Sequence, residues 1–251
     1  MYEDKSLYQF TYFNSRLYLL YVNILICIMV ISHKHKFIFI HNYKVAGTSI
    51  TKSLSPYGIK NPTNSHILNS ILGSPLVNNF EVTRRGVDIL LNKSPIERIP
   101  SHITAQQLSE ITSQEKWDTY FKFGFVRNPW DWQVSLYHYA LQSPEHHQYN
   151  LTNSFNLFSR YIEWRVREDK VLQKSFFYSK TSRKLVDFIG KMENISTDFQ
   201  KVCAKIGIES HLPHSNKSKR KRNYREYYNE HTKELIEKHF KEDIDQFDYT
   251  F

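Results

Sequence analysis

Five residues near position 45 have the types that bind a phosphate group. They lie in the segment FIFIHNYKVAGTSI, after an apolar run, and they are Lys44, Ala46, Gly47, Thr48 and Ser49. Alanine and glycine let the backbone approach an anion closely, the hydroxyls donate hydrogen bonds, and the lysine adds a mobile cation with three donors. At the start of a helix, free N–H groups and the helix dipole strengthen such a site. The segment predicts a phosphate cradle; the alternative is a plain strand-to-helix turn with a surface lysine.

A second segment repeats this plan later in the chain. In FKFGFVRNPWDWQVSLY, Arg127 follows an apolar run and Ser135 comes eight residues further on. An arginine at the end of a strand can hold a second phosphate with its planar fork. The alternative is an ion pair between Arg127 and Asp131 that fixes the turn. Two such segments in one chain favour a ligand with two separated phosphates.

These residues need a sheet to position them. Residues 36–41 and 121–126 each predict a short buried strand, and each strand is followed by residues with helical periodicity. Ligands of open α/β sheets bind outside the carboxyl ends of the strands. Strands that alternate with helices predict an α/β protein whose mainly parallel sheet is covered on both faces.

The rest of the chain predicts further helices around this sheet. Residues 60–100 are irregular with one or two short helices, and a helix capped by Ser101 or Thr104 follows them. Residues 152–190 are mainly helical, and DFIGKMENI, residues 187–195, carries a further strand or helix edge. Residues 231–251 predict an amphipathic helix with an aromatic tail.

The composition favours an anionic partner. The 251 residues carry a net charge of +9, which suits a nucleic acid, a membrane surface, a phosphate cofactor or an acidic glycan. Part of the charge lies in NKSKRKR, residues 216–222, for which a solvated loop is the alternative. Cys27 and Cys203 lie far apart and fit no metal or disulfide pattern, which favours a reducing compartment.

The N-terminal region predicts a separate extension. Residues 17–31 are uncharged but shorter than the roughly 20 residues that a membrane-spanning helix needs. They have no clear signal-peptide pattern. Three interpretations stay open: a helix packed on the protein, a short membrane-associating segment, or an upstream extension that is not native. We therefore divide the chain into an extension, 1–34, and a single domain, 35–251.

The two phosphate segments together resemble the carbohydrate-type, family 2 sulfotransferases that use 3′-phosphoadenosine 5′-phosphosulfate (PAPS). FIFIHNYKVAGTSI resembles their 5′-phosphosulfate loop, F-I-H-x-P-K-T-A-G-T-S, and FVRNPWDWQVSLY resembles their 3′-phosphate motif, R-N-P-[YW]-D-x-x-x-S-x-Y. The resemblance continues in SHITAQQL, DFIGKMENI, LPHSNKSKR and HFKEDIDQFDYTF, and covers residues 35–251. This chain departs from the pattern with Tyr43 in place of proline and Val45 in place of threonine.

The resemblance implies a fold, a reaction and a set of residue roles. The fold is a three-layer α/β/α domain with a central, mainly parallel sheet, the P-loop-like sulfotransferase fold. The reaction transfers a sulfuryl group from PAPS, without a metal, to a hydroxyl of a carbohydrate or glycoconjugate by in-line displacement. Lys44 is implied as a catalytic residue that neutralises the leaving oxygen. The implied donor-binding residues are Lys44, Ala46, Gly47, Thr48 and Ser49 for the 5′-phosphate, Arg127 and Ser135 for the 3′-phosphate, and Lys217, Ser218 and Lys219 in a closing loop.

The acceptor hydroxyl must lose a proton, so a general base is expected. His102, in PSHIT, corresponds to a histidine before a helix in carbohydrate sulfotransferases, and a pKa near 6.5 suits a base. His41 is the other candidate, and a surface or capping role is the alternative for any of the 12 histidines. Glu193 is expected to be structural and to pair with a basic residue. Trp130 and Trp132 either stack on the ligand or pack in the core.

Two other functions compete with this one. A nucleotide kinase would use a similar cradle, but G-x-x-x-x-G-K-[ST] and an acidic Mg²⁺ motif are absent from the sequence. A non-enzymatic polyanion binder would show steep salt dependence. No nucleic-acid-binding motif is visible, so no nucleic-acid partner is expected, and the sequence specifies no oligomeric state. We expect a bacterial-type cytoplasmic enzyme, with membrane association through residues 17–31 left open; a Golgi membrane protein is the alternative.

Overall fold

The computed structural model describes residues 30–57, 102–169, 171–213 and 223–251. Three predictions fall on residues outside these ranges. They concern most of the uncharged run 17–31, the irregular stretch that ends near residue 100, and the loop residues Lys217, Ser218 and Lys219.

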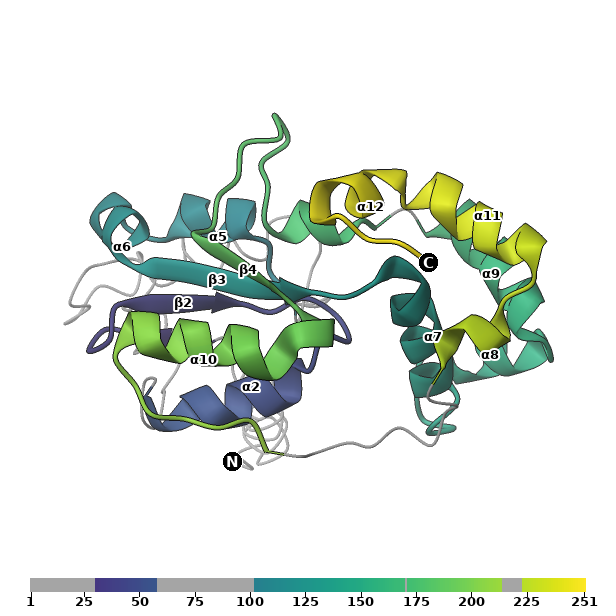
Figure 1. Ribbon diagram of the computed structural model, residues 1–251, viewed down its shortest axis with the longest axis horizontal. Helices are drawn as coiled ribbons and strands as arrows, with labels where there is room; N and C mark the ends of the chain where they lie inside the picture. The colour runs from purple at the N-terminus through teal and green to yellow at the C-terminus, as the bar shows by residue number, and fades with distance from the viewer. Residues whose placement is uncertain (1–29, 58–101, 170, 214–222) are drawn as a thin grey trace, which may run out of the picture.

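The described strands form one four-stranded sheet in the order β1-β2-β3-β4. The strands are β1 (Val30–Ser32), β2 (Phe37–Ile40), β3 (Phe121–Val126) and β4 (Phe188–Lys191). β1 runs antiparallel to β2, whereas β2, β3 and β4 are parallel to one another. Figure 1 shows β2, β3 and β4 side by side. The predicted α/β class with a mainly parallel sheet is confirmed.

Both strands predicted before the phosphate segments are present as β2 and β3. DFIGKMENI contains β4 and, after it, the 3-10 turn Met192–Asn194, so both a strand and a helix edge are present in this segment. β1 was not expected: it lies before residue 35, where we placed the start of the domain, and it pairs with β2 from Val30↔Phe39 to Ser32↔Phe37. The sheet therefore begins upstream of that boundary.

Helices and 3-10 turns connect and cover the strands. The α-helices are α2 (Gly47–Leu54), α5 (Ala105–Ile111), α6 (Gln114–Thr119), α7 (Pro129–Ala140), α8 (Tyr149–Ser154), α9 (Phe158–Glu168), α10 (Ile195–Ile206), α11 (Glu230–His239) and α12 (Lys241–Phe247). The 3-10 turns are η1 (Ser55–Tyr57), η2 (Gln173–Phe176), η3 (Met192–Asn194) and η4 (Tyr224–Tyr227). α5 is capped by Thr104, which forms a capping box with Gln107.

Two of the predicted helical regions differ from the structure. The region 152–190 is helical only up to Glu168; η2 and a turn closed by the bridge Tyr178↔Lys184 follow it. The single C-terminal helix is divided into α11 and α12 at Phe240, which ends the first helix and caps the second.

The apolar core lies on both faces of the sheet. On one face Phe37, Phe39 and Phe123 pack with apolar residues of α2 and α10. On the other face Ile38 and Ile40 pack with α5 and α6, so successive residues of β2 point to opposite faces and all four are buried. Burial of each large side chain contributes about 1.5–3 kcal/mol. These contacts keep the carboxyl ends of β2 and β3 rigid.

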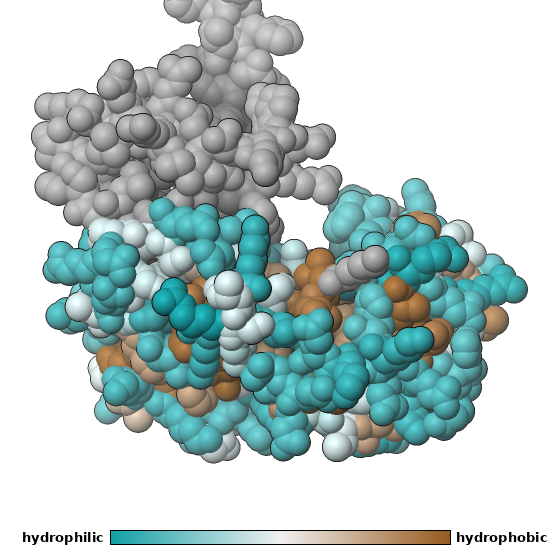
Figure 2. All heavy atoms as spheres, turned by 90° about the horizontal axis from the view of Figure 1, so that it is seen from above, coloured by the Kyte–Doolittle hydropathy of each residue, from teal (hydrophilic) through white to brown (hydrophobic). Residues whose placement is uncertain are grey.

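A third apolar cluster joins the helices that follow the strands. Trp132 of α7 packs with Ile162 of α9 and with Ile236 and Phe240 at α11. Figure 1 shows α7, α8, α9 and α11 grouped beyond the ends of β3 and β4. In Figure 2 the coloured surface is mainly hydrophilic, with hydrophobic residues in small separate patches. No helix in the described ranges combines the length and apolar character needed to cross a membrane.

Candidate active site

The loop after β2 has the backbone shape of an anion-binding turn. Lys44 and Ala46 both adopt left-handed conformations, with φ of 54° and 59°, on either side of Val45. When left-handed residues alternate with others in this way, successive backbone N–H groups point towards one concave side. α2 begins at Gly47, and its N-cap residue Ala46 has no side-chain oxygen to accept from the first-turn N–H groups. The loop therefore presents backbone donors at the positive end of α2.

Gly47 also makes room for a neighbouring ring. A Cβ atom at Gly47 would lie 1.6 Å from His41 Nε2, a separation that no real contact permits. The imidazole of His41 therefore packs directly on the backbone at the start of α2. Since any side chain at position 47 would displace this ring, glycine is required here by packing as well as by access to an anion.

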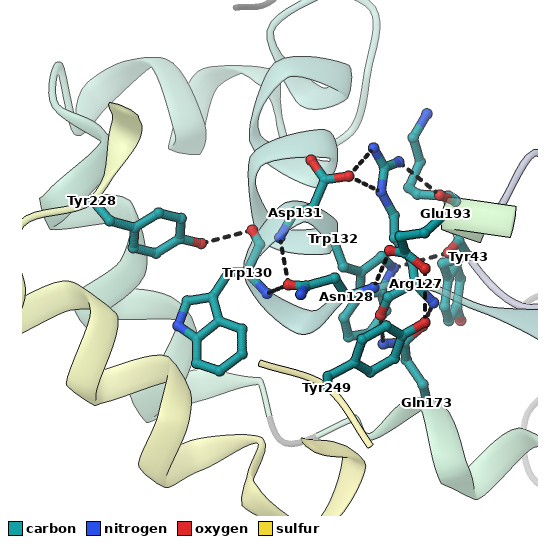
Figure 3. A network of polar contacts seen from close by, with 11 residues as sticks. Tyr43, Arg127, Asn128, Trp130, Asp131, Trp132, Gln173, Glu193, Tyr228 and Tyr249 are labelled. Carbon is teal, nitrogen blue, oxygen red and sulfur yellow. Dashed lines mark hydrogen bonds and ion pairs between the residues drawn. The ribbon is translucent and has the colours of Figure 1, made fainter. Parts of the chain in front are cut away.

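Arg127 joins the loops that follow β2 and β3. It is only 7% exposed. Its Nε and Nη2 atoms lie 2.7 and 2.6 Å from Asp131 Oδ2, and its Nη1 donates to the Lys44 carbonyl at 3.1 Å. Figure 3 shows the Arg127 guanidinium beside the Asp131 carboxylate. The ion pair considered as the alternative for Arg127 is therefore present, and it fixes a guanidinium that also touches the first phosphate segment.

A buried glutamine holds the two strand ends together. Gln173, at the start of η2, accepts from the Arg127 N–H at 2.9 Å and donates to the Arg127 carbonyl at 2.7 Å. Its Oε1 also accepts from Asn42 Nδ2 at 3.1 Å. Asn42 follows β2, and its Nδ2 lies 3.3 Å from the carbonyl of Phe125 in β3. One side-chain amide thus continues the hydrogen bonding of the sheet beyond its last residues.

Asp243 fixes Gln173 in turn. Its two carboxylate oxygens accept from the backbone N–H groups of Gln173 and Lys174, each at 2.8 Å. Asp243 is fully buried, and burial raises the pKa of its carboxyl to about 6, although the two N–H donors oppose this rise. A residue of α12 therefore supports the turn that supports Arg127.

The RNPWD turn is held from its other side by Glu193. Glu193 accepts from the Asn128 N–H at 2.6 Å and from the Tyr249 hydroxyl at 3.0 Å (Figure 3). Asn128 Oδ1 caps α7 at Trp130, and its Nδ2 donates to the Thr250 carbonyl. The partners described for Glu193 are thus a backbone amide and a phenol, not the basic residue that we expected.

His102 lies beside the first loop, and one hydrogen bond determines which of its ring nitrogens carries the proton. Its Nδ1 is 3.0 Å from the His41 carbonyl, which can only accept, so Nδ1 carries the proton and Nε2 keeps its electron pair. Burial lowers the pKa of His102. Burial, with His102 nearby, lowers the pKa of His41 to about 3, so both imidazoles are neutral at pH 7. His102 thus has the electronic form that a general base needs.

The α7 helix connects both segments. It starts at the RNPWD turn, carries Ser135, and ends near Tyr139, whose ring centroid lies 3.6 Å from Lys44 Nζ. Trp130 and Trp132 are buried, and their indole N–H groups donate to the carbonyls of Lys233 and Tyr43. Both tryptophans therefore pack in the core.

The structure brings several of the predicted residues together and adds others. Lys44, Arg127 and His102 lie around the ends of β2 and β3, whereas Lys217, Ser218 and Lys219 are outside the described residues. Four residues around the site were not predicted from the sequence: Asn42, Gln173, Asp243 and Tyr139. Only Asn42 has a local signal, as a polar residue directly after a buried strand.

The fold and site define an α/β protein with a candidate anion site at the carboxyl edge of a parallel sheet. The model of the sulfotransferase family matches residues 28–250. The chain therefore belongs to the sulfotransferase family and is a transferase. Neither the curated proteins nor the solved structures gave a match. In the part of the chain that the structure describes, no cluster of three metal-ligating side chains is present.

Proposed function

We propose that this protein transfers a sulfuryl group from PAPS to a hydroxyl of a carbohydrate acceptor. One observation carries the proposal: the Arg127 guanidinium donates to the carbonyl of Lys44. The two segments with phosphate-binding residue types therefore meet at one edge of the sheet. This proximity suits a single adenosine that carries one phosphate at its 5′ position and another at its 3′ position. Helices against both faces of the sheet fit the three-layer, P-loop-like arrangement.

The first loop binds the 5′ end of the donor in this proposal. The residues assigned to the 5′-phosphate are Lys44, Ala46, Gly47, Thr48 and Ser49. The left-handed backbone at Lys44 and Ala46 turns N–H groups towards the anion. The Lys44 ammonium neutralises the negative charge that develops on the leaving oxygen.

The second segment binds the 3′-phosphate. Arg127 and Ser135 are assigned to it, and Lys217, Ser218 and Lys219 are assigned to nucleotide binding. Asp131 restrains the guanidinium through an ion pair that is mostly shielded from solvent, with side-chain exposures of 9% and 15%. A restrained arginine loses little freedom when an anion binds, which favours selective recognition.

His102 acts as the general base in the proposed reaction. Its Nε2 takes the proton of the acceptor hydroxyl while the acceptor oxygen forms a bond to sulfur. The bond between sulfur and the oxygen of the 5′-phosphate breaks, and Lys44 stabilises the charge on that oxygen. Positioning and charge stabilisation supply most of the rate in such a displacement. His41 is less suited, because its Nε2 packs against Gly47.

A carbohydrate acceptor is supported by the family resemblance and by an aromatic surface beside Lys44. Tyr139 is 45% exposed, and the His146 ring meets it edge-on at 5.0 Å between centroids. Apolar faces of sugar rings pack on exposed aromatic side chains of this kind. The surface lies next to the lysine assigned to the leaving group, where an acceptor has to bind.

Calorimetry with three nucleotides tests the proposed donor. We expect 3′-phosphoadenosine 5′-phosphate (PAP) to bind at least about tenfold more tightly than ADP or ATP, because only PAP offers a 3′-phosphate to Arg127. Arg127→Ala should remove this preference. Equal binding of PAP and ADP would contradict the proposal, and tighter binding of ATP would favour a kinase.

Radiolabelled PAPS tests the reaction itself. The protein is incubated with desulfated glycosaminoglycans and with neutral oligosaccharides, and labelled product is counted. His102→Ala should lower turnover while PAP affinity is retained. A protein that binds no PAP and labels no glycan would contradict the proposal.

A further inference from the structure

Tyr43 stands where the resemblance predicts a proline, and its backbone is held at both ends. Its N–H donates to Asn42 Oδ1 at 2.7 Å, and its carbonyl accepts from Trp132 Nε1 at 2.9 Å. Proline has no N–H and could not make the first bond. Because Asn42 and Trp132 are both fully buried, these anchors belong to the rigid core. The position from which the Tyr43 side chain extends is therefore fixed.

The Tyr43 ring packs on the imidazole of His102. The two ring centroids are 3.8 Å apart and the planes are tilted by 48°. The His41 ring contacts the same imidazole with a centroid separation of 4.6 Å. Phe176 supports Tyr43 with an edge-on contact at 5.3 Å. His102 is thus held by two rings and by its hydrogen bond to the His41 carbonyl.

We propose that Tyr43 is a positioning residue for His102: its ring holds the imidazole so that Nδ1–H stays on the His41 carbonyl. The proton-accepting electron pair then stays on Nε2. When Nε2 takes the proton of the acceptor hydroxyl, the imidazolium keeps its Nδ1–H bond to that carbonyl. The inference rests on the proposed function, in which His102 is the base.

The surroundings make the titration of His102 sensitive to this ring. The titratable groups that the structure places against it are His41 and Tyr43. Burial lowers the pKa of His41 to about 3 and raises the pKa of Tyr43, so neither is charged at pH 7. Since burial lowers the pKa of His102, loss of the ring at position 43 should let that pKa rise towards 6.5.

A pair of variants separates the ring from the backbone. Tyr43→Phe keeps the aromatic face and Tyr43→Leu removes it, while both keep the N–H that donates to Asn42. The pKa of His102 is followed by NMR of its imidazole, identified among the 12 histidines by its absence in His102→Asn. We expect a pKa below 6.5 in the wild type and in Tyr43→Phe, and a higher value in Tyr43→Leu. The same pKa in all three proteins would overturn the inference.

Kinetics with radiolabelled PAPS and a glycan accepted in the screen give the second readout. Tyr43→Leu should lower kcat at pH 7 about three- to tenfold, the size expected for a lost aromatic contact. It should also move the acid limb of the pH profile to higher pH, which a merely structural role would not do. Tyr43→Phe should restore kcat to within about twofold, and PAP affinity should be unchanged in both.

A double variant decides whether Tyr43 acts through His102. In the His102→Asn background, Tyr43→Leu should cause no further loss of kcat. If Tyr43→Leu lowered kcat further in that background, or lowered PAP affinity and not kcat, Tyr43 would act on the donor loop. The inference would then fail. The NMR arm needs neither donor nor acceptor. A protein that binds no PAP and sulfates no glycan therefore ends the proposed function, while NMR still decides the role of Tyr43.

Discussion

Gly47→Ala should destabilise the protein through one defined clash. The added methyl group would lie 1.6, 2.1 and 2.6 Å from Nε2, Cδ2 and Cε1 of His41, so the imidazole must move. The ring has little room, because it stacks on Phe39 at 5.7 Å and contacts His102 at 4.6 Å between centroids. Overpacking of this kind costs about 1–3 kcal/mol. Thermal unfolding should show a Tm lower by roughly 2–4 °C for each kcal/mol lost.

The same substitution should weaken donor binding. If the start of α2 shifts, at least one N–H group no longer faces the 5′-phosphate. A hydrogen bond to a charged group contributes about 1.5–3 kcal/mol, so PAP affinity should fall about ten- to hundredfold. Gly190→Ala is the matched control: its methyl group would meet the Phe125 ring at 2.4 Å, on β4, which β3 separates from β2. It should lower Tm but leave PAP affinity nearly unchanged.

Removal of the displaced ring tests the cause. In the His41→Ala background the methyl group at position 47 enters the space that the imidazole has left. The double variant should therefore be more stable than the sum of the single losses predicts, by about 1 kcal/mol or more. Strictly additive losses, or a Gly47→Ala protein that unfolds and binds PAP like the wild type, would show that no clash with His41 limits position 47.

Three further predictions concern the supports of the site. Burial raises the pKa of Asp243 to about 6, so stability should fall by about 3 kcal/mol at most as pH rises from about 4 to about 6. Asp243→Asn should abolish this slope in urea unfolding; an unchanged slope would contradict the assignment. Gln173→Leu should cost about 2–4 kcal/mol in the same assay, because the N–H and carbonyl of Arg127 lose their buried partner. A double-mutant cycle of Tyr139→Leu with Lys44→Met should give an interaction energy of about 0.5–1 kcal/mol between the two side chains. Tyr139→Phe keeps the aromatic face, so the same cycle with Tyr139→Phe should give almost none.

The strands that carry the site were predictable because their signals are local. The apolar runs before Lys44 and Arg127 are short, buried and followed by polar turns, and they are β2 and β3 in the structure. The pair Arg127–Asp131 was also readable, since Arg127 directly precedes the N-cap of α7 and Asp131 lies in the first turn of that helix. β1 was missed because Val30–Ser32 continues the uncharged run that ends at residue 31, so no change of composition marks its start.

The supports of the site were not predictable, because they depend on contacts across long stretches of chain. Gln173 bonds to Asn42 across 131 positions and to Arg127 across 46. Asp243 reaches Gln173 from a helix 70 positions later. An amide or a carboxylate in an amphipathic segment has no local mark that separates a buried partner from a solvated side chain. Such residues become visible only when the sheet order and the helix packing are known.

The register of two parallel strands explains why the phosphate segments meet. Ile40 lies opposite Gly124, so β2 ends two residues before the end of β3 at the same edge of the sheet. Asn42 follows two residues after the first position and Arg127 three residues after the second, and one glutamine bonds to both. A shift of the register would separate these residues and remove the bond from Arg127 to the Lys44 carbonyl, even with every motif residue kept. The candidate site is thus a property of the pairing of β2 with β3, and the motifs that suggest it from the sequence become one site only through that pairing.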